Sequence, residues 1–246
     1  MRIAVLSDIH ANREALEAVL ELVEELAPDQ IVILGDLVGY GPDPEFAIET
    51  VARLVSDGAL CVLGNHDEAA RSDRDKLTPN AREAIRWTRT RLNDDHRAFL
   101  AALPLSITRF GCQWVHASAY RPESWDYVSD PEAALRCLAA STEALICCGH
   151  THRPTVFYSH PNRRPTMFVP RDEIAAPLLP RHRHVIVTGA VGQPRDGNPA
   201  ACFALLDLEE ASVTMRRVPY DSEATAAKIK RLGLSSWLGL RLLIGR

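Results

Sequence analysis

The sequence lacks most features that mark membrane, secreted or nucleic-acid-binding proteins. No apolar run approaches the roughly 20 residues that a membrane helix needs. The chain begins directly with a strand-like segment, residues 2–6, so we expect no secretory signal. Aromatic residues make up only 6% of the chain and the formal net charge is −4, which disfavours general binding to nucleic acid or to an anionic membrane.

The cysteines also lack the spacing of a metal-binding or redox motif. No two of them form a Cys-x-x-Cys pair, and most lie in apolar runs. We therefore expect neither a disulfide framework nor a thiolate zinc site, and predict reduced, mostly buried thiols in a cytoplasmic protein. The cysteines are Cys61, Cys112, Cys137, Cys147, Cys148 and Cys202.

What is present indicates an α/β protein. The chain has 246 residues, of which 46% are hydrophobic, enough to bury a substantial core. Short β-branched runs alternate with helical patterns in the first third, and strand patterns dominate the second half. We predict strands near residues 3–6, 31–34, 59–63, 106–110, 112–115, 144–148, 155–158, 167–169, 184–187, 202–206 and 213–218, and helices near residues 13–26, 46–55, 78–92, 94–103 and 131–140.

These elements favour a β-sandwich flanked by helical layers. We predict one domain over residues 1–246, with a helical insertion at about residues 68–103. Residues 161–182 contain five prolines and predict an irregular loop. The tail, residues 221–246, predicts two helices broken at Gly233, and we expect its apolar side chains to cap the core: Trp237, Leu238, Leu240, Leu242 and Leu243.

Five short motifs place metal-ligand side chains just after separate apolar runs. None is specific alone, but glycine turns and ligand-type residues recur in a fixed order. Ligands that follow strands meet in the crevice beyond the carboxyl ends of a sheet. The set therefore predicts two adjacent metal sites suited to phosphoester hydrolysis. The motifs are Asp8-x-His10, Gly35-Asp36, Gly64-Asn65-His66-Asp67, His116 and Gly149-His150-Thr151-His152.

The ligand types limit the metal and its chemistry. Asp36 is the natural bridge, because one carboxylate can serve two cations. Two divalent cations, two aspartates and a bridging hydroxide would leave about one positive charge to attract a phosphate oxygen. The cations would also lower the pKa of bound water towards about 7. With no thiolate, the site favours Mn, Fe, Zn, Co or Ni, and Mn is our preferred assignment.

The full motif set resembles that of the calcineurin-like metallophosphoesterases, over residues 3 to about 158. Residues 189–198 resemble a later active-site loop of small bacterial and archaeal members. The resemblance implies a four-layer αββα sandwich of two mixed sheets and a dinuclear, metal-dependent phosphoesterase. It implies one metal held by Asp8, His10, Asp36 and His152, a second held by Asp36, Asn65, His116 and His150, and His66 as the acid that protonates the leaving oxygen or stabilises its charge.

One departure from the superfamily pattern separates this chain from ordinary protein Ser/Thr phosphatases. Those enzymes carry GDxVDRG, whose second aspartate orients the catalytic histidine and whose arginine grips phosphate. Gly39 and Tyr40 stand at these two places. Asp67 is the alternative partner that we expect for His66.

Candidate substrate contacts lie in and around the later loop. Arg195 follows a Gly-Gln-Pro turn and is suited to bidentate phosphate contact, although an ordinary surface arginine fits the same sequence. Asn12, Tyr40, Arg121 and Trp125 are candidates to line the pocket, with structural roles as the alternative. The arginines of the expected insertion, Arg82, Arg86, Arg89 and Arg91, would form either a phosphate-attracting face or, as base rates favour, a solvated helix surface.

The leading hypothesis is hydrolysis of a small phosphodiester by attack of a metal-bridging hydroxide. A nucleotide-type substrate, such as a cyclic nucleotide or a dinucleoside polyphosphate, stays open. The alternatives are a phosphomonoesterase or protein Ser/Thr phosphatase on the same site, a nuclease, and a non-catalytic protein-binding scaffold. A scaffold should have lost ligands, yet all seven ligand positions and His66 are present. A nuclease should show a basic groove with stacking aromatics. The oligomeric state is not encoded.

Overall fold

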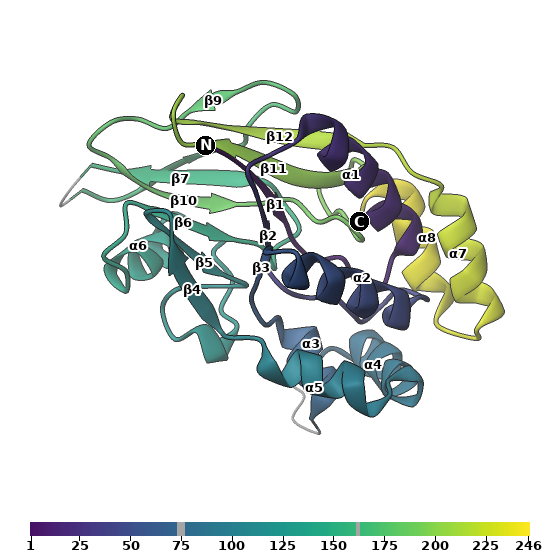
Figure 1. Ribbon diagram of the computed structural model, residues 1–246. Coiled ribbons are helices and arrows are strands. Elements are labelled where there is room, and N and C mark those ends of the chain that lie inside the picture. The colour runs from purple at the N-terminus through teal and green to yellow at the C-terminus, as the bar shows by residue number, and fades with distance from the viewer. Residues whose placement is uncertain (73–76, 161–162) are drawn as a thin grey trace.

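Two mixed β-sheets stack face to face with helices on both outer sides, as the sequence predicted (Figure 1). The computed structural model describes residues 1–72, 77–160 and 163–246. Residues 73–76 of the expected insertion and residues 161–162 of the expected loop lie outside the described residues.

The first sheet combines a parallel half with an antiparallel half. β1 pairs in parallel with β2, which pairs in parallel with β3, whereas β11 runs antiparallel to β1. The strand order is β3-β2-β1-β11-β12-β9. The bounds are β1 Arg2–Leu6, β2 Gln30–Ile33, β3 Leu60–Cys61, β9 Ala176–Pro177, β11 Ala201–Asp207 and β12 Ser212–Val218.

The second sheet has the same mixed character. β5, β6 and β10 are parallel neighbours, and antiparallel strands extend the sheet on both sides. The strand order is β4-β5-β6-β10-β7-β8. The bounds are β4 Ser106–Arg109, β5 Cys112–Val115, β6 Leu145–Cys148, β7 Thr155–Ser159, β8 Thr166–Phe168 and β10 Arg183–Val187.

Alternation along the strands builds the layers. In β1, Ile3 and Val5 join the core between the sheets, whereas Ala4 and Leu6 face the helices on the outer side. The opposite outer face packs against α6. The helices are α1 Arg13–Leu26, α2 Pro44–Ser56, α3 Asn65–Arg71, α4 Pro79–Arg91, α5 Asp94–Ala102, α6 Pro131–Ala139, α7 Ser222–Arg231 and α8 Ser236–Ile244, with a 3-10 turn at Pro122–Ser124.

Three local predictions were wrong in part. The expected irregular loop contains β9. This strand has no clear sequence pattern, because it is two residues long, includes a proline and pairs with β12 at the edge of the sheet. The solvated helix surface favoured for the arginines of α4 is found at Arg86 and Arg91, which are exposed, whereas Arg89 is partly buried. Arg89 instead donates to the backbone oxygens of Ala69 and Ser72, and Arg91 pairs with Glu45 at 2.7 Å.

The third concerns the C-terminal tail. Two helices do flank Gly233, but only Leu238 and Leu242 cap the core. These two residues are four apart and therefore share one helix face. The other face of α8 leaves Trp237, Leu240 and Leu243 exposed.

All six cysteines are buried and free, as predicted. Within the described ranges, no helix has the length and apolarity that a membrane crossing would require.

Candidate metal centre

The predicted ligands converge at one edge of the sandwich. β1, β2 and β3 are parallel, as are β5 and β6, so the loops that follow these strands leave from the same ends of the sheets. The residues concerned are buried, except that Asn65 is partly exposed. We call this group the candidate metal centre: Asp8, His10, Asp36, Asn65, His116, His150 and His152.

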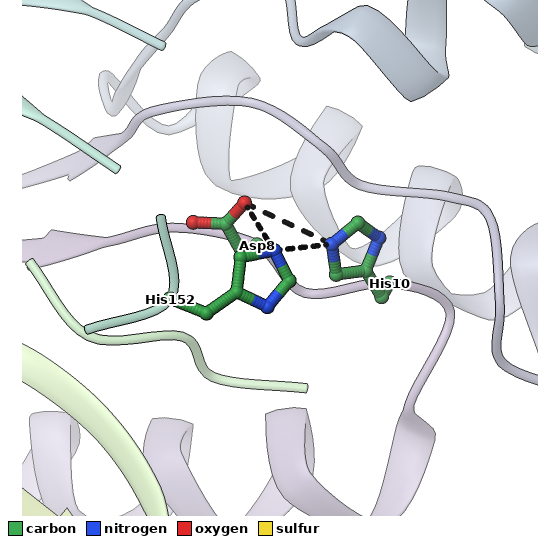
Figure 2. Close-up of side chains that lie close together, drawn as sticks. All are labelled: Asp8, His10 and His152. Atoms are coloured by element: carbon green, nitrogen blue, oxygen red, sulfur yellow. Dashed lines mark hydrogen bonds and ion pairs between the residues drawn. The ribbon is translucent and has the colours of Figure 1, made fainter. Parts of the chain in front are cut away.

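One half of the centre consists of Asp8, His10 and His152, whose side chains point toward one another (Figure 2). The Nε2 atom of His152 lies 3.2 Å from Asp8 Oδ1 and 3.2 Å from His10 Nε2. His10 Nε2 lies 3.7 Å from the same carboxylate oxygen. Three ligand atoms thus surround one small space.

The other half contains Asp36, His116 and His150, with Asn65 beside them. His116 Nε2 lies 3.3 Å from Asp36 Oδ2, 3.1 Å from Asn65 Oδ1 and 3.0 Å from His150 Nδ1. The same Asp36 oxygen is 3.7 Å from His10 Nε2 in the first half. Asp36 therefore stands between the two halves.

Backbone carbonyls fix the orientation of three of the imidazoles. The Nδ1 atoms of His10, His116 and His152 lie 3.1, 2.8 and 2.6 Å from the carbonyl oxygens of Val38, Leu34 and Gln193. A carbonyl only accepts, so each Nδ1 carries a proton, and in the neutral ring each Nε2 turns its lone pair to the centre.

This arrangement fits a cation in each half. The lone pairs of His10 and His152 face each other at 3.2 Å, a contact that a neutral pair does not satisfy. Asp8 Oδ1 is buried and has no hydrogen-bond partner among the residues that the structure describes. Buried charge of this kind is normally paired or coordinated to a metal.

The electrostatics point the same way. Burial alone would raise the pKa of Asp8 and Asp36, but the neighbouring histidines lower both, so the carboxylates stay ionised. Burial lowers the pKa of His150 to about 3. Burial also opposes protonation of His116, yet the charge of Asp36 raises its pKa to about 9. The negative potential that retains a proton there would equally favour a metal cation.

Asp67 does not orient His66, contrary to the prediction. Its carboxylate accepts from the backbone N–H groups of Leu37 at 2.8 Å, Val38 at 3.2 Å and Gly64 at 3.1 Å. Successive side chains of α3 diverge around the helix, which separates the two groups. Burial, reinforced by the charge of Asp36, raises the pKa of Asp67 to about 7.

Packing instead positions His66. Its Nδ1 is buried without a hydrogen-bond partner, and a Cβ placed on Gly39 would lie only 2.3 Å from that atom. The ring centroid of Tyr40 lies 4.5 Å away and that of His10 4.9 Å away. With Nδ1 enclosed, Nε2 is the ring nitrogen left for the cleft. Burial lowers the pKa of His66 to about 4, so the ring is neutral near pH 7.

A cleft of about 590 Å³ opens over the centre, and Tyr40, Trp125 and Arg195 line it as predicted candidates. Arg195 Nη2 donates to Gln193 Oε1 at 2.9 Å, and the guanidinium lies 5.7 Å from the Tyr40 ring. The volume is typical of small-molecule sites.

Two other candidates lie outside the lining of this cleft. Asn12 is buried, caps α1 by accepting from Ala15 N at 3.2 Å, and donates to Gly192 O at 2.8 Å. These contacts give Asn12 the structural role that was the alternative to a place in the pocket. The Arg121 guanidinium lies over the Tyr120 ring at 5.2 Å. Sequence reasoning missed Glu68 and Tyr127, which do line the cleft. The only signal for Tyr127 was its position two residues after Trp125.

Comparisons with known proteins agree with this geometry. The model of the calcineurin-like phosphoesterase superfamily domain matches residues 1–211. The chain belongs to that family and is a metal-dependent phosphoric ester hydrolase, as its motifs predicted.

Among individual proteins, the crystal structure of a metallophosphoesterase from Sphaerobacter thermophilus is similar over 100% of this chain and 99% of that one, with 36% identity and a TM-score of 0.87. The uncharacterized protein MJ0912 of Methanocaldococcus jannaschii is 33% identical over 99% of this chain and 98% of its own length. Phosphodiesterase YfcE of Escherichia coli K12 is 25% identical over 87% of this chain and 91% of its own length.

Proposed function

We propose that this chain is a dinuclear phosphodiesterase that acts on a small phosphoester. The observation that carries the proposal is the sharing of Asp36, whose Oδ2 lies 3.3 Å from His116 and 3.7 Å from His10. One carboxylate between two ligand groups suits two cations separated by a few ångströms. We assign Asp8, His10, Asp36 and His152 to one cation and Asp36, Asn65, His116 and His150 to the other.

The metal pair would supply Lewis acidity toward the phosphoryl oxygens and water activated near neutral pH. Mn²⁺ is our preferred metal, with Fe, Zn, Co and Ni as alternatives. Buried carboxylates and oriented imidazoles favour these ions over alkali cations.

The protein's own groups have separate tasks in this proposal. Arg195 binds a non-bridging phosphate oxygen, because it lines the cleft and its Nε lacks a partner. His66 faces the leaving oxygen with Nε2–H and stabilises the charge that develops there. Tyr40 contacts both the His66 ring and the Arg195 guanidinium, so it holds the two groups in a fixed relation.

A diester is favoured over a monoester on two grounds. The cleft of about 590 Å³ extends beyond the ligands to Arg195 and Tyr40 and to Trp125 and Tyr127. The E. coli relative that aligns with most of the chain is named a phosphodiesterase. Gly39 and Tyr40 replace the aspartate and arginine expected of protein Ser/Thr phosphatases, which makes that alternative weaker. The arginines engaged by Glu45 and backbone carbonyls weaken the nuclease alternative. The buried free cysteines favour a cytoplasmic location.

The decisive experiment compares two chromogenic substrates under defined metal loading. The protein is stripped of metal, reloaded with Mn²⁺, and assayed on bis-p-nitrophenyl phosphate and p-nitrophenyl phosphate. Asp36→Asn should lose bound metal and turnover by orders of magnitude. The matched control Asp57→Asn, at an exposed position after α2, should retain both.

Each outcome has a defined reading. Faster Mn²⁺-dependent cleavage of the diester supports the proposal, and a preference for the monoester would make phosphomonoesterase the better assignment. Wild-type metal content and activity in Asp36→Asn would refute the dinuclear assignment. A properly folded protein with no turnover under any metal would support the scaffold alternative.

A further inference from the structure

The cleft over the candidate metal centre has two unlike ends. Above the Asp8–His10–His152 half stand Tyr40 and Arg195, and the backbone N–H of Arg195 donates to His152 O at 3.2 Å. Above the His116–His150 half stand Trp125 and Tyr127. The cationic and aromatic ends therefore lie on opposite sides of Asp36.

Tyr127 presents an aromatic face to the cleft. Its ring stacks on His150 with a centroid distance of 4.1 Å and an interplanar angle of 13°. Despite this contact, 53% of the residue is exposed. The imidazole covers one ring face, and the exposed remainder borders the cleft, so the ring is held in position with surface available for a second planar group.

Trp125 is held beside it in an unusual backbone conformation. Its φ is +59°, in the left-handed region that bulky residues rarely adopt. The indole Nε1 donates to Glu68 Oε2 at 3.0 Å, and the ring meets His116 edge-on at 5.9 Å. Such conformations persist where neighbouring contacts impose them and cluster at ligand sites.

The remaining walls distinguish this end chemically. Near Trp125 the lining supplies two carboxylates, Glu68, whose Oε2 accepts from Trp125 Nε1, and Glu123, two residues before Trp125, whereas Leu77 and Ala81 pack beside Tyr40. Carboxylates accept N–H and O–H donors and repel a second anion. An uncharged planar group with donors around its edge fits this end, whereas a phosphate fits the Arg195 end.

We propose that Tyr127 and Trp125 form a stacking subsite for the nucleobase of a nucleoside phosphodiester, with Glu68 and Glu123 accepting hydrogen bonds from its amino or sugar hydroxyl groups. This inference rests on the proposed phosphodiesterase function and adds the substrate class. Stacking on an aromatic side chain tolerates any base, so the subsite selects nucleosides without choosing one base.

The test uses two diesters with the same leaving group. Thymidine 5′-(p-nitrophenyl phosphate) carries a base and sugar, and methyl p-nitrophenyl phosphate carries neither. For the Mn²⁺-loaded wild type we expect kcat/KM for the thymidine ester to exceed that for the methyl ester by at least about 10-fold. Tyr127→Leu should reduce this ratio by about 10- to 100-fold, mainly through KM of the thymidine ester, whereas Tyr127→Phe should preserve it.

The controls separate the two levels of inference. Trp237→Leu, which removes a 47% exposed aromatic residue on α8, should leave the ratio unchanged. Cleavage of the methyl ester with a ratio that Tyr127→Leu does not alter would overturn the subsite and leave the phosphodiesterase standing. Failure of the wild type to cleave either ester would overturn both. If Tyr127→Leu lowers kcat/KM for both esters by the same factor, Tyr127 only supports His150, and the subsite is also overturned.

Discussion

Replacing Gly39 by alanine tests how this protein positions His66. A Cβ at Gly39 would lie 2.3 Å from His66 Nδ1 and 3.0 Å from His66 Cγ. Ordinary contact begins at 3.4 Å, so the imidazole must retreat by about 1 Å (3.4 − 2.3) or the loop must shift. Misplacement of a reacting group by this distance costs on the order of 100-fold in rate.

The same substitution also destabilises the fold. Gly39 has φ +87°, and an alanine in the left-handed region costs about 1–2 kcal/mol. Overpacking against the buried ring adds about 1–3 kcal/mol. We therefore expect the free energy of unfolding to fall by about 2–5 kcal/mol, the sum of these two costs.

Gly58→Ala is the matched control, because Gly58 has φ +105° and a Cβ at that position would meet nothing within 4 Å. It should show the backbone cost of about 1–2 kcal/mol and wild-type kcat. The assays are urea unfolding and steady-state kinetics on bis-p-nitrophenyl phosphate with Mn²⁺, with metal content measured in parallel. Equal kcat in both variants would refute the claim that Gly39 makes room for a catalytic His66.

Three further predictions address the substrate, the metal and the fold. Arg195→Ala should raise KM for the diester by about 10- to 100-fold with a smaller change in kcat. The control Arg171→Ala, at an exposed position, should leave KM unchanged. An unaltered KM in Arg195→Ala would remove Arg195 from the site. Mn²⁺ at 100 times its dissociation constant should stabilise the metal-free protein by about 2.7 kcal/mol for each of the two proposed sites in urea unfolding, and Asp36→Asn should abolish this increment. Burial lowers the pKa of His184 from 6.5 to about 4, so below pH 6.5 the unfolded protein binds a proton that the folded protein does not. The free energy of unfolding should therefore fall by about 1.4 kcal/mol per pH unit between pH 6.5 and pH 4. His184→Gln, which keeps an acceptor for Leu179 N, should remove that contribution, and an identical pH slope in both proteins would contradict it.

The fold and the clustering of the candidate ligands were predictable because both are encoded locally. A β-branched run followed by Asp, Asn or His predicts which side chains lie just beyond the end of each strand. Asp8, which comes shortly after Leu6, is an example. Parallel pairing of β1 with β2 and of β5 with β6 then brings those ends together without further information. Periodicity likewise located the helices that cover the sheets.

Contacts between distant segments were not encoded in this way. A solvated surface was the favoured expectation for the arginines of α4, and only the structure shows Arg89 bound to a backbone oxygen of α3. Asp67 looked like a partner for its neighbour His66, but the backbone of the Leu37–Val38 turn occupies its carboxylate. A single sequence does not show which of several acceptors a side chain reaches once the chain is folded.

The loss of an aspartate at position 39 and the aromatic end of the cleft can be understood together. With glycine there, His66 is held by ring contacts to Tyr40 and His10 and by the tight space at Gly39. Tyr40 also lies beneath Arg195, so one ring connects the proposed acid to the proposed phosphate ligand. Tyr40 thus stands where protein Ser/Thr phosphatases carry the arginine, and the proposed phosphate ligand, Arg195, comes from a later loop. Among the described residues that line the cleft, Arg195 is the only arginine or lysine and lies beside Tyr40, whereas Tyr127 lies at the His116–His150 side and suits an uncharged group.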